Sequence, residues 1–175
     1  MRKQIIDEFL PQETFKELQN DILSTRFPFF IENKVNNFQT EKNKFDWYAT
    51  HTLYDDHISK SSYFSNMESV VNRINEIAIV RALLRIKVNF YPYTEKLIEH
   101  APHTDDEFSH MGAVFSLNTC DGFTRLCDGS IVNSIENRIV FFDASTMHNS
   151  TTTTTAIGRY NCLLYTSDAA DEHRR

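Results

Sequence analysis

His103-Thr104-Asp105 is the stretch that decides the fold, and His148 and Arg159 follow it along the chain. Residues two apart on a strand project to the same side, so His103 and Asp105 can face one point. His148 comes shortly after an apolar, strand-like run at 138–142, RIVFF. Two imidazoles and one carboxylate form the facial triad of non-haem Fe(II) sites, which leaves coordination positions open. We therefore predict that His103, Asp105 and His148 are metal ligands and form the catalytic centre.

Arg159 lies eleven residues after His148, within Ile157-Gly158-Arg159-Tyr160-Asn161. That spacing allows a turn and part of a returning strand, so the guanidinium could reach back beside the metal. Its planar fork matches a carboxylate in a bidentate manner. A His-x-Asp pair alone is weak evidence, but the ordered set is stronger because one barrel geometry accounts for its order and spacings.

The ordered set resembles the 2-oxoglutarate- and Fe(II)-dependent dioxygenases of the prolyl 4-hydroxylase type, especially the short versions common in bacteriophage and marine metagenomes. The resemblance runs from about Ile5 to Asn161. Besides the triad and Arg159, it rests on three stretches of sequence: Ile6–Pro11, Arg85–Pro92 and Asn137–Asp143.

The resemblance implies a hydroxylase that uses Fe(II), 2-oxoglutarate and O₂, with ascorbate as an optional further cofactor. The co-substrate would be decarboxylated to succinate and CO₂ while a substrate C–H bond is hydroxylated. Arg159 would then clamp the distal carboxylate of 2-oxoglutarate. Peptidyl proline is the substrate that the family name suggests, but free amino acids, other peptides, nucleobases and small metabolites stay open.

The segment 85–91 alternates between an apolar face and a polar face. The resemblance implies that the polar face lies beside the co-substrate, with Tyr91 and Asn89 among the residues that bind it. A Tyr packed at the barrel rim is the alternative for Tyr91, and Lys87 is the alternative to Arg159 as the carboxylate clamp. The apolar face consists of Ile86, Val88 and Phe90, and the polar face of Arg85, Lys87, Asn89 and Tyr91.

Apolar spacing predicts a helix over residues 12–24, with Phe15, Leu18 and Ile22 on one face, and a second helix from about Met67 to Val80. Residues 26–60 have no clean period and are expected to form short strands and a long loop. Short strands follow, with a two-residue Asp128-Gly129 hairpin turn between 123–127 and 130–134. The five threonines 151–155 are expected to be a strand or its approach. This order predicts a mainly β, α+β domain: N-terminal support helices and a double-stranded β-helix, the jelly-roll or cupin-like barrel.

The 175 residues fit one domain, and the net charge of −6 makes a nucleic-acid partner unlikely. No apolar run is long enough to span a bilayer and no signal peptide is evident, so we expect a soluble, cytoplasmic protein whose partner is a small-molecule or peptide substrate. The oligomeric state stays open. The three cysteines form neither a disulfide framework nor a zinc knuckle, and reduced thiols are expected. His51, His57, His100 and His110 are expected at the surface or in loops, with substrate contact open for the last two.

Residues 162–172, CLLYTSDAADE, match the translation of the reverse complement of a transposase-type sequencing adapter. We therefore divide the chain into a dioxygenase domain at 1–161 and a non-native, adapter-derived tail at 162–175. Leu163, Leu164 and Tyr165 could still pair as a strand, whereas 167–175 is expected to be poorly ordered or a frayed helix on the surface.

Two other functions would use the same barrel. One is a cupin-like jelly roll that holds a structural or hydrolytic metal with the same three ligands. The other is a catalytically silent binding module, such as a phage accessory protein. Arg159 argues against the first, because a hydrolase does not need it, and the intact triad argues against the second.

Overall fold

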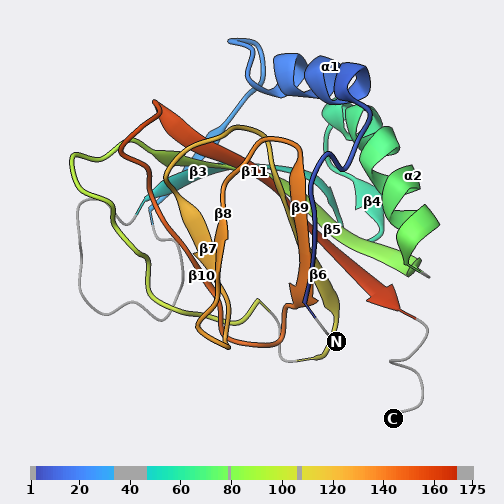
Figure 1. Cartoon of the computed structure of the whole chain (residues 1–175). Coiled ribbons are helices and arrows are strands. Elements are labelled where there is room, and N and C mark those ends of the chain that lie inside the picture. Colours follow the sequence, from blue (N-terminus) through green and yellow to red (C-terminus); the bar gives the residue numbers. More distant parts are fainter. Residues whose placement is uncertain (1–2, 34–46, 79, 106–107, 169–175) are drawn as a thin grey trace.

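Two antiparallel sheets face each other, and two helices lie against the outside of the larger one (Figure 1). The computed structural model describes residues 3–33, 47–78, 80–105 and 108–168. Its elements, in chain order, are β1 (Gln4–Ile6), α1 (Gln12–Ile22), β2 (Phe30–Glu32), β3 (Tyr48–Asp55), β4 (Ile58–Ser59), the 3-10 helix η1 (Ser62–Met67), α2 (Glu68–Ile77), β5 (Val80–Pro92), β6 (Met111–Ser116), β7 (Phe123–Arg125), β8 (Ile131–Asn133), β9 (Arg138–Asp143), β10 (Asn149–Ser150) and β11 (Gly158–Asp168).

The larger sheet has the strand order β1-β9-β6-β11-β5-β3-β2, with β4 paired to β3. The smaller sheet has the order β10-β7-β8. Strands that are distant in sequence therefore alternate in space, and β11 returns to pair with both β5 and β6. This arrangement confirms the predicted double-stranded β-helix with support helices.

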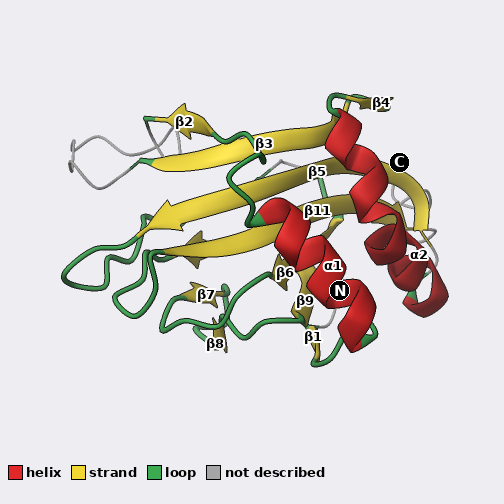
Figure 2. Ribbon diagram, turned by 90° about the horizontal axis from the view of Figure 1, so that it is seen from above, coloured by secondary structure: helices red, strands yellow, loops and turns green. Residues whose placement is uncertain are grey.

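Each face of the larger sheet has its own apolar core. On the outer face, α1 and α2 pack on residues such as Val88, Phe115 and Leu164, and the helices cover this face in Figure 2. Each fully buried side chain of this kind contributes about 1.5–3 kcal/mol. On the inner face, between the sheets, a smaller cluster surrounds Val140 and Phe142. The strands alternate between these two environments, so polar side chains on the inner face are directed between the sheets.

The predicted helices are present, with one corrected boundary. Phe15, Leu18 and Ile22 form the buried face of α1, as predicted. The second helix was expected to reach Val80, but α2 ends at Ile77 and Val80 already begins β5. Ala78 is extended, with φ −128° and ψ 146°, where the chain turns into the longest strand. Residues 26–60 form the expected short strands β2, β3 and β4, and 34–46 lie outside the described residues.

The hairpin between β7 and β8 is present, but its loop has three residues instead of two. The Leu126 N–H donates to the Ser130 carbonyl at 3.0 Å, and the Gly129 N–H donates to the Leu126 carbonyl at 2.9 Å. Gly129 adopts φ +79°, the left-handed conformation that such a loop requires. The Asp128-Gly129 signal therefore located the hairpin correctly but not its loop length.

The threonines 151–155, which precede β11, form isolated β-bridges and not a continuous strand. Thr151 bridges Glu99 and Thr153 bridges Tyr93, and both threonines are fully buried. The hydroxyls of Thr153, Thr154 and Thr155 hydrogen-bond the Asp121 carboxylate. These bonds outweigh the effect of burial and hold the pKa of Asp121 well below its usual value. The network fixes the turn from which β11 starts, and Arg159 is the second residue of that strand.

The predicted division at Asn161 falls inside β11. Residues 162–166 pair with both β5 and β6, and Cys162, Leu164 and Tyr165 are buried. Ser167 and Asp168, expected to be poorly ordered or helical, instead pair with Ala82 and Val80. Residues 169–175 lie outside the described residues, and the adapter origin of 162–175 stays a prediction. No helix in the described part of the chain has the length and apolar character needed to cross a membrane.

Candidate metal centre

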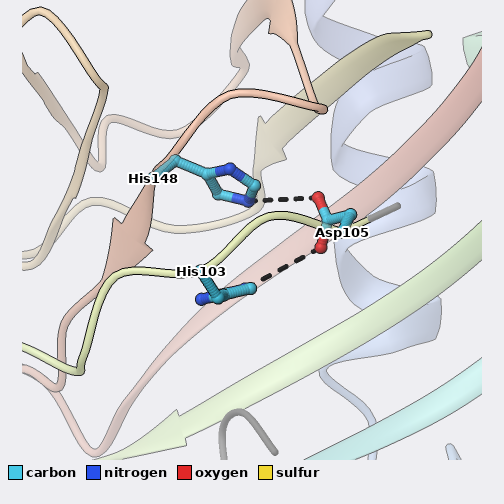
Figure 3. A group of neighbouring side chains, drawn as sticks. All are labelled: His103, Asp105 and His148. Carbon is cyan, nitrogen blue, oxygen red and sulfur yellow. Dashed lines mark ion pairs between the residues drawn. The ribbon is translucent and has the colours of Figure 1, made fainter. Parts of the chain in front are cut away.

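The two candidate histidine ligands lie side by side because their backbones form an isolated antiparallel bridge. His103 lies in the segment between β5 and β6, and His148 in the segment between β9 and β10. The backbone N–H of each donates to the carbonyl of the other at 2.9 Å. The two imidazoles are 4.8 Å apart between ring centroids (Figure 3). The spacing in the sequence indicated two neighbouring extended segments, which the structure shows as this bridge.

Asp105 completes the group. Its backbone N–H donates to the Ala144 carbonyl at 3.2 Å, which draws the His-x-Asp segment towards the chain that leads to His148. One carboxylate oxygen lies 3.0 Å from His148 Nε2 and the other 3.8 Å from His103 Nε2 (Figure 3). Ligand atoms of all three side chains lie within 4.8 Å of one another. The structure thus brings His103, Asp105 and His148 together at one point.

The remaining hydrogen bonds of the two histidines leave Nε2 for a metal. His148 Nδ1 is 2.9 Å from the Thr146 carbonyl, and His103 Nδ1 is 3.4 Å from the Ala101 carbonyl. A carbonyl accepts only from an N–H, so these contacts place the proton on Nδ1 of the neutral ring. The buried Oδ2 atom of Asp105 lies 3.0 Å from His148 Nε2, the atom that would also bind the metal. Three convergent donors from the described residues fit a cation with open coordination positions.

The protonation equilibria of the three side chains are coupled. Burial disfavours the charged form of Asp105, but hydrogen bonding and attraction from His148 prevail and lower the pKa of Asp105. Burial likewise disfavours protonated His148, yet the hydrogen bond to Asp105 raises the pKa of His148. Burial and the charge of His148 lower the pKa of His103. Without a metal, both of these pKa shifts favour an ion pair between protonated His148 and the Asp105 carboxylate.

Arg159 is a buried cation with an incomplete set of partners. Its side chain is 1% exposed, and burial lowers its pKa. Nη2 donates to Thr124 Oγ1 at 2.7 Å, and the guanidinium carbon lies 5.6 Å from the centre of the Tyr91 ring. Nε and Nη1 are buried and have no hydrogen-bond partner among the described residues. A buried charge without a counter-ion is costly, so this geometry fits an anion that arrives from outside.

Gly122 makes room for Arg159. A Cβ atom on Gly122 would lie 2.7 Å from Arg159 Cδ and 2.8 Å from the Thr152 carbonyl oxygen. Any larger residue would therefore displace the guanidinium stem or the backbone of the threonine segment. The sequence offered no signal for this role, because the contact joins residues far apart in the chain.

Tyr91 pairs with Arg159 across β5 and β11, so its ring lies beside the guanidinium. It is buried, it stacks on Tyr48 at 5.7 Å between ring centroids, and Ser150 hydrogen-bonds its phenol. Burial raises the pKa of Tyr91, so the phenol stays protonated and can donate a hydrogen bond. Tyr91 therefore lies inside the barrel and not at its rim.

Asn89 lies on the same face as Tyr91, but hydrogen bonds between strands occupy its amide. Thr50 Oγ1 donates to Asn89 Oδ1 at 2.9 Å, and Asn89 Nδ2 donates to Asn161 Oδ1 at 3.5 Å. The predicted division of 85–91 into two faces is confirmed, since Ile86 and Val88 belong to the outer core.

The inner face of the larger sheet forms rows of paired residues across β11, β5 and β3. Successive rows are two residues, or about 6.6 Å, apart along the strands. The first row holds Arg159, Tyr91 and Tyr48; the second Asn161, Asn89 and Thr50; the third Leu163, Lys87 and Thr52; and the fourth Tyr165, Arg85 and Asp55. Arg159 and Lys87 therefore lie in different rows and have different surroundings.

Three histidines are buried, contrary to the surface roles predicted for them. His51 packs between Phe27, Phe30 and Tyr63 on the outer face. The ring of His100 lies 5.5 Å from that of Tyr91, and its Nδ1 atom is 2.9 Å from Ser150 Oγ. His110 packs edge-on against Tyr165 at 5.1 Å. Of the four, only His57 is exposed as expected.

Tyr165 is the main site residue that the sequence reasoning missed. Its phenol hydrogen-bonds Asp105, and this bond contributes to the low pKa of that carboxyl. Burial and the neighbouring carboxylate raise the pKa of Tyr165 well above its usual value. Tyr165 was not predicted as a site residue because it lies in the segment attributed to an adapter. Its spacing of six residues from Arg159 nevertheless puts both side chains on the inner face.

Comparisons with known proteins identify the fold. Neither the models of protein families nor the curated protein sequences match this chain. A solved prolyl hydroxylase from Trichoplax adhaerens, in complex with a hypoxia inducible factor peptide fragment, is similar with a TM-score of 0.66 at 13% identity over 98% of this chain and 86% of that one.

Two further structures are similar over most of their lengths. A viral collagen prolyl hydroxylase from Paramecium Bursaria Chlorella virus-1, in its 2OG complex, has a TM-score of 0.62 at 10% identity, covering 95% of this chain and 96% of that one. The non-heme alpha ketoglutarate dependent epimerase SnoN, from nogalamycin biosynthesis, has a TM-score of 0.69 at 13% identity, covering 95% and 78%. At such identities the likeness establishes a shared fold.

Proposed function

We propose that this protein is an Fe(II)- and 2-oxoglutarate-dependent dioxygenase that hydroxylates a small-molecule or peptide substrate. The observation that carries the proposal is the buried guanidinium of Arg159, with two unpartnered N–H groups, in the same barrel as the His103, Asp105 and His148 triad. The similar structures support it, because they are prolyl hydroxylases and an alpha ketoglutarate dependent epimerase.

The three ligands and Arg159 would divide the work of binding. His103, Asp105 and His148 would hold Fe(II), which together with 2-oxoglutarate and O₂ supplies the oxidising chemistry and yields succinate and CO₂. Arg159 would bind the distal carboxylate of the co-substrate through its two unpartnered N–H groups. Tyr91 and Thr124 hold the guanidinium in place from two sides. The sheets around them exclude water, which strengthens every charge interaction.

Arg159 fits the co-substrate better than Lys87 does. It is fully buried, it belongs to the first row of the inner face, and Tyr91 provides an adjacent phenol. Lys87 is partly buried and lies two rows further along β5. A structural or hydrolytic metal site has no use for a buried guanidinium, and structural zinc sites have four protein ligands, whereas the described residues supply three here.

The similar structures suggest more than one class of substrate. Peptidyl proline is suggested by the two prolyl hydroxylases among the similar structures, whereas SnoN comes from nogalamycin biosynthesis. Fold likeness does not select among substrates, because barrels of one kind host many reactions.

The proposal is tested by adding Fe(II) and 2-oxoglutarate to the protein without oxygen and following the visible absorption of the complex. We expect a saturable band in the parent protein and in the control Arg138→Ala, which alters an arginine paired with Asp7 away from the site. His148→Ala should give no band. A screen for succinate release in air would then follow. A parent protein that binds metal but gives no band with 2-oxoglutarate would disprove the proposal.

A further inference from the structure

Lys87 is a cation on the inner face for which the proposed function has no role. It belongs to the third row, between Leu163 on β11 and Thr52 on β3. Its side chain is partly buried, and burial together with the neighbouring Arg85 lowers its pKa. Among the described residues it forms no ion pair, so its charge is held inside the barrel without a direct counter-ion.

The carboxylates around Lys87 are committed to other partners. Asp105 is a candidate metal ligand, and a bound metal ion would take up its charge. Asp55 forms an ion pair with Arg85 at 2.9 Å. Glu32 acts on Lys87 only from an exposed position on the short strand β2. With the metal and 2-oxoglutarate bound, Lys87 is therefore left without a direct counter-ion among the described residues.

Lys87 also lies in a different part of the inner face from Arg159 and next to the row of Tyr165, whose phenol hydrogen-bonds Asp105. Four residues, or about 13 Å along β5, separate it from Tyr91, the residue that pairs with Arg159. Asp105 acts electrostatically on both Lys87 and Tyr91, so the metal ligands lie within reach of both rows. The first row serves the co-substrate in the proposed function. The third and fourth rows lie beside Asp105 and away from Arg159, and this is the part of the inner face to which we assign the substrate.

We propose that Lys87 binds a carboxylate group of the primary substrate, and that this enzyme acts on an organic acid. This inference rests on the proposed function, which assigns Arg159 to the co-substrate. Leu163 and Thr52 pair with Lys87 on the two neighbouring strands, and Tyr165 belongs to the next row, so apolar side chains and a hydroxyl are its neighbours on the sheet. The site thus suits an acid with an apolar body, such as a free amino acid, better than a neutral segment of peptide chain. The ammonium group and the substrate carboxylate would form the missing ion pair.

The first test measures binding without turnover. The protein is loaded with Zn²⁺ and saturating 2-oxoglutarate, its lysines carry ¹³C at Cε, and the Lys87 resonance is assigned by its loss in Lys87→Met. Acetate should shift this resonance in a saturable manner. Acetamide, which has a similar shape to acetate but no charge, should not shift it. Lys60→Met is the matched control, since Lys60 is an exposed lysine outside the inner face, in the segment after β4. Equal responses to acetate and acetamide, or no response to either, would overturn the inference.

The second test uses Fe(II), O₂ and pairs of amino acids and their amides, with succinate release as the signal. Acids should stimulate release more than the matched amides, and Lys87→Met should reduce that stimulation by about 10- to 150-fold, the value of one charge-assisted contact. The affinity for 2-oxoglutarate should stay unchanged in Lys87→Met. If the parent protein fails to bind 2-oxoglutarate, the proposed function fails as well. If 2-oxoglutarate binds normally and amides match the acids, only the role of Lys87 is wrong.

Discussion

At the scale of single residues, the candidate site depends on charged side chains whose partners are incomplete or are themselves metal ligands. The Asp105 carboxylate lies 3.0 Å from the ligand atom of His148, and Arg159 has two buried N–H groups without a hydrogen-bond partner among the described residues. The sequence predicted the triad and Arg159, because their order and spacing carry the information. It did not predict Gly122, Thr124 or Tyr165, whose contacts depend on how distant strands pair.

Changing a metal ligand should remove metal binding and leave the fold intact. Asp105→Ala removes one of three metal ligands. The loss of a residue that only hydrogen-bonds a metal ligand already lowers metal affinity by about 10- to 100-fold. We expect a larger loss than that by calorimetric titration with Zn²⁺ or Fe(II), with an unchanged circular dichroism spectrum. Thr104→Ala, at the residue between the two ligands, is the control. Parent-like affinity in Asp105→Ala would show that the triad is misassigned.

Metal affinity should fall on acidification. The hydrogen bond to Asp105 raises the pKa of His148 above 6.5, despite burial. At a pH below this raised pKa, the metal must therefore displace a proton from His148. Affinity should then drop by about tenfold per pH unit for each proton displaced. In the metal-free protein, the stabilisation by His148 is complete below 6.5 and is lost as the pH rises through the raised pKa. Asp105 has a lowered pKa, so the stabilisation that it contributes is lost as the pH falls through that lowered pKa. A metal affinity that is constant between pH 5 and 8 would contradict the His148–Asp105 pairing.

Arg159→Met should stabilise the ligand-free protein while removing co-substrate binding. The buried guanidinium is uncompensated, and replacing buried charges with apolar side chains of similar size often gains about 1–4 kcal/mol. Urea unfolding of the metal-free protein measures this gain, and Arg138→Met provides the control at an ion-paired arginine. A clear loss of stability in Arg159→Met would show that the guanidinium has partners in the ligand-free fold.

At the scale of elements, periodicity located the helices and the polar face of β5, whereas pairing decided the rest. The second helix ended earlier than predicted because strand β5 takes the chain from Val80 onwards. The hairpin loop is one residue longer than predicted because Gly129, in the left-handed conformation, follows the turn as an additional loop residue. His51, His100 and His110 were predicted at the surface or in loops because the sequence does not show their ring contacts, which come from other elements of the fold.

The segment 162–168 should be required for stability whatever its origin. Leu164 is fully buried in the outer core, and truncating such a leucine typically costs about 2–5 kcal/mol. Leu164→Ala should therefore lower the free energy of unfolding by that amount. Ser167→Ala, near the end of the same strand, should change it by less than about 0.5 kcal/mol. Equal stability of Leu164→Ala and the parent would mean that this half of β11 does not pack as described.

At the scale of the whole molecule, the barrel places two cations and the candidate metal centre in one interior. Arg159 belongs to the first row of the inner face and Lys87 to the third. In the proposed function, this arrangement would let the chain hold a dicarboxylate co-substrate and an acidic substrate at once. The sequence predicted the barrel through its triad, but the rows became evident only from the register of β3, β5 and β11.

The most direct test of the central claim compares 2-oxoglutarate with 2-oxobutyrate, which lacks the distal carboxylate, in the parent protein and in Arg159→Ala. Both ligands are titrated into the Fe(II)-loaded proteins without oxygen, and dissociation constants are taken from the visible band. The parent should prefer 2-oxoglutarate by about 30- to 1000-fold, the value of a charge-assisted bidentate contact of about 2–4 kcal/mol, and Arg159→Ala should show almost no preference. An equal preference in both proteins would contradict the role of Arg159 and, with it, the proposed function.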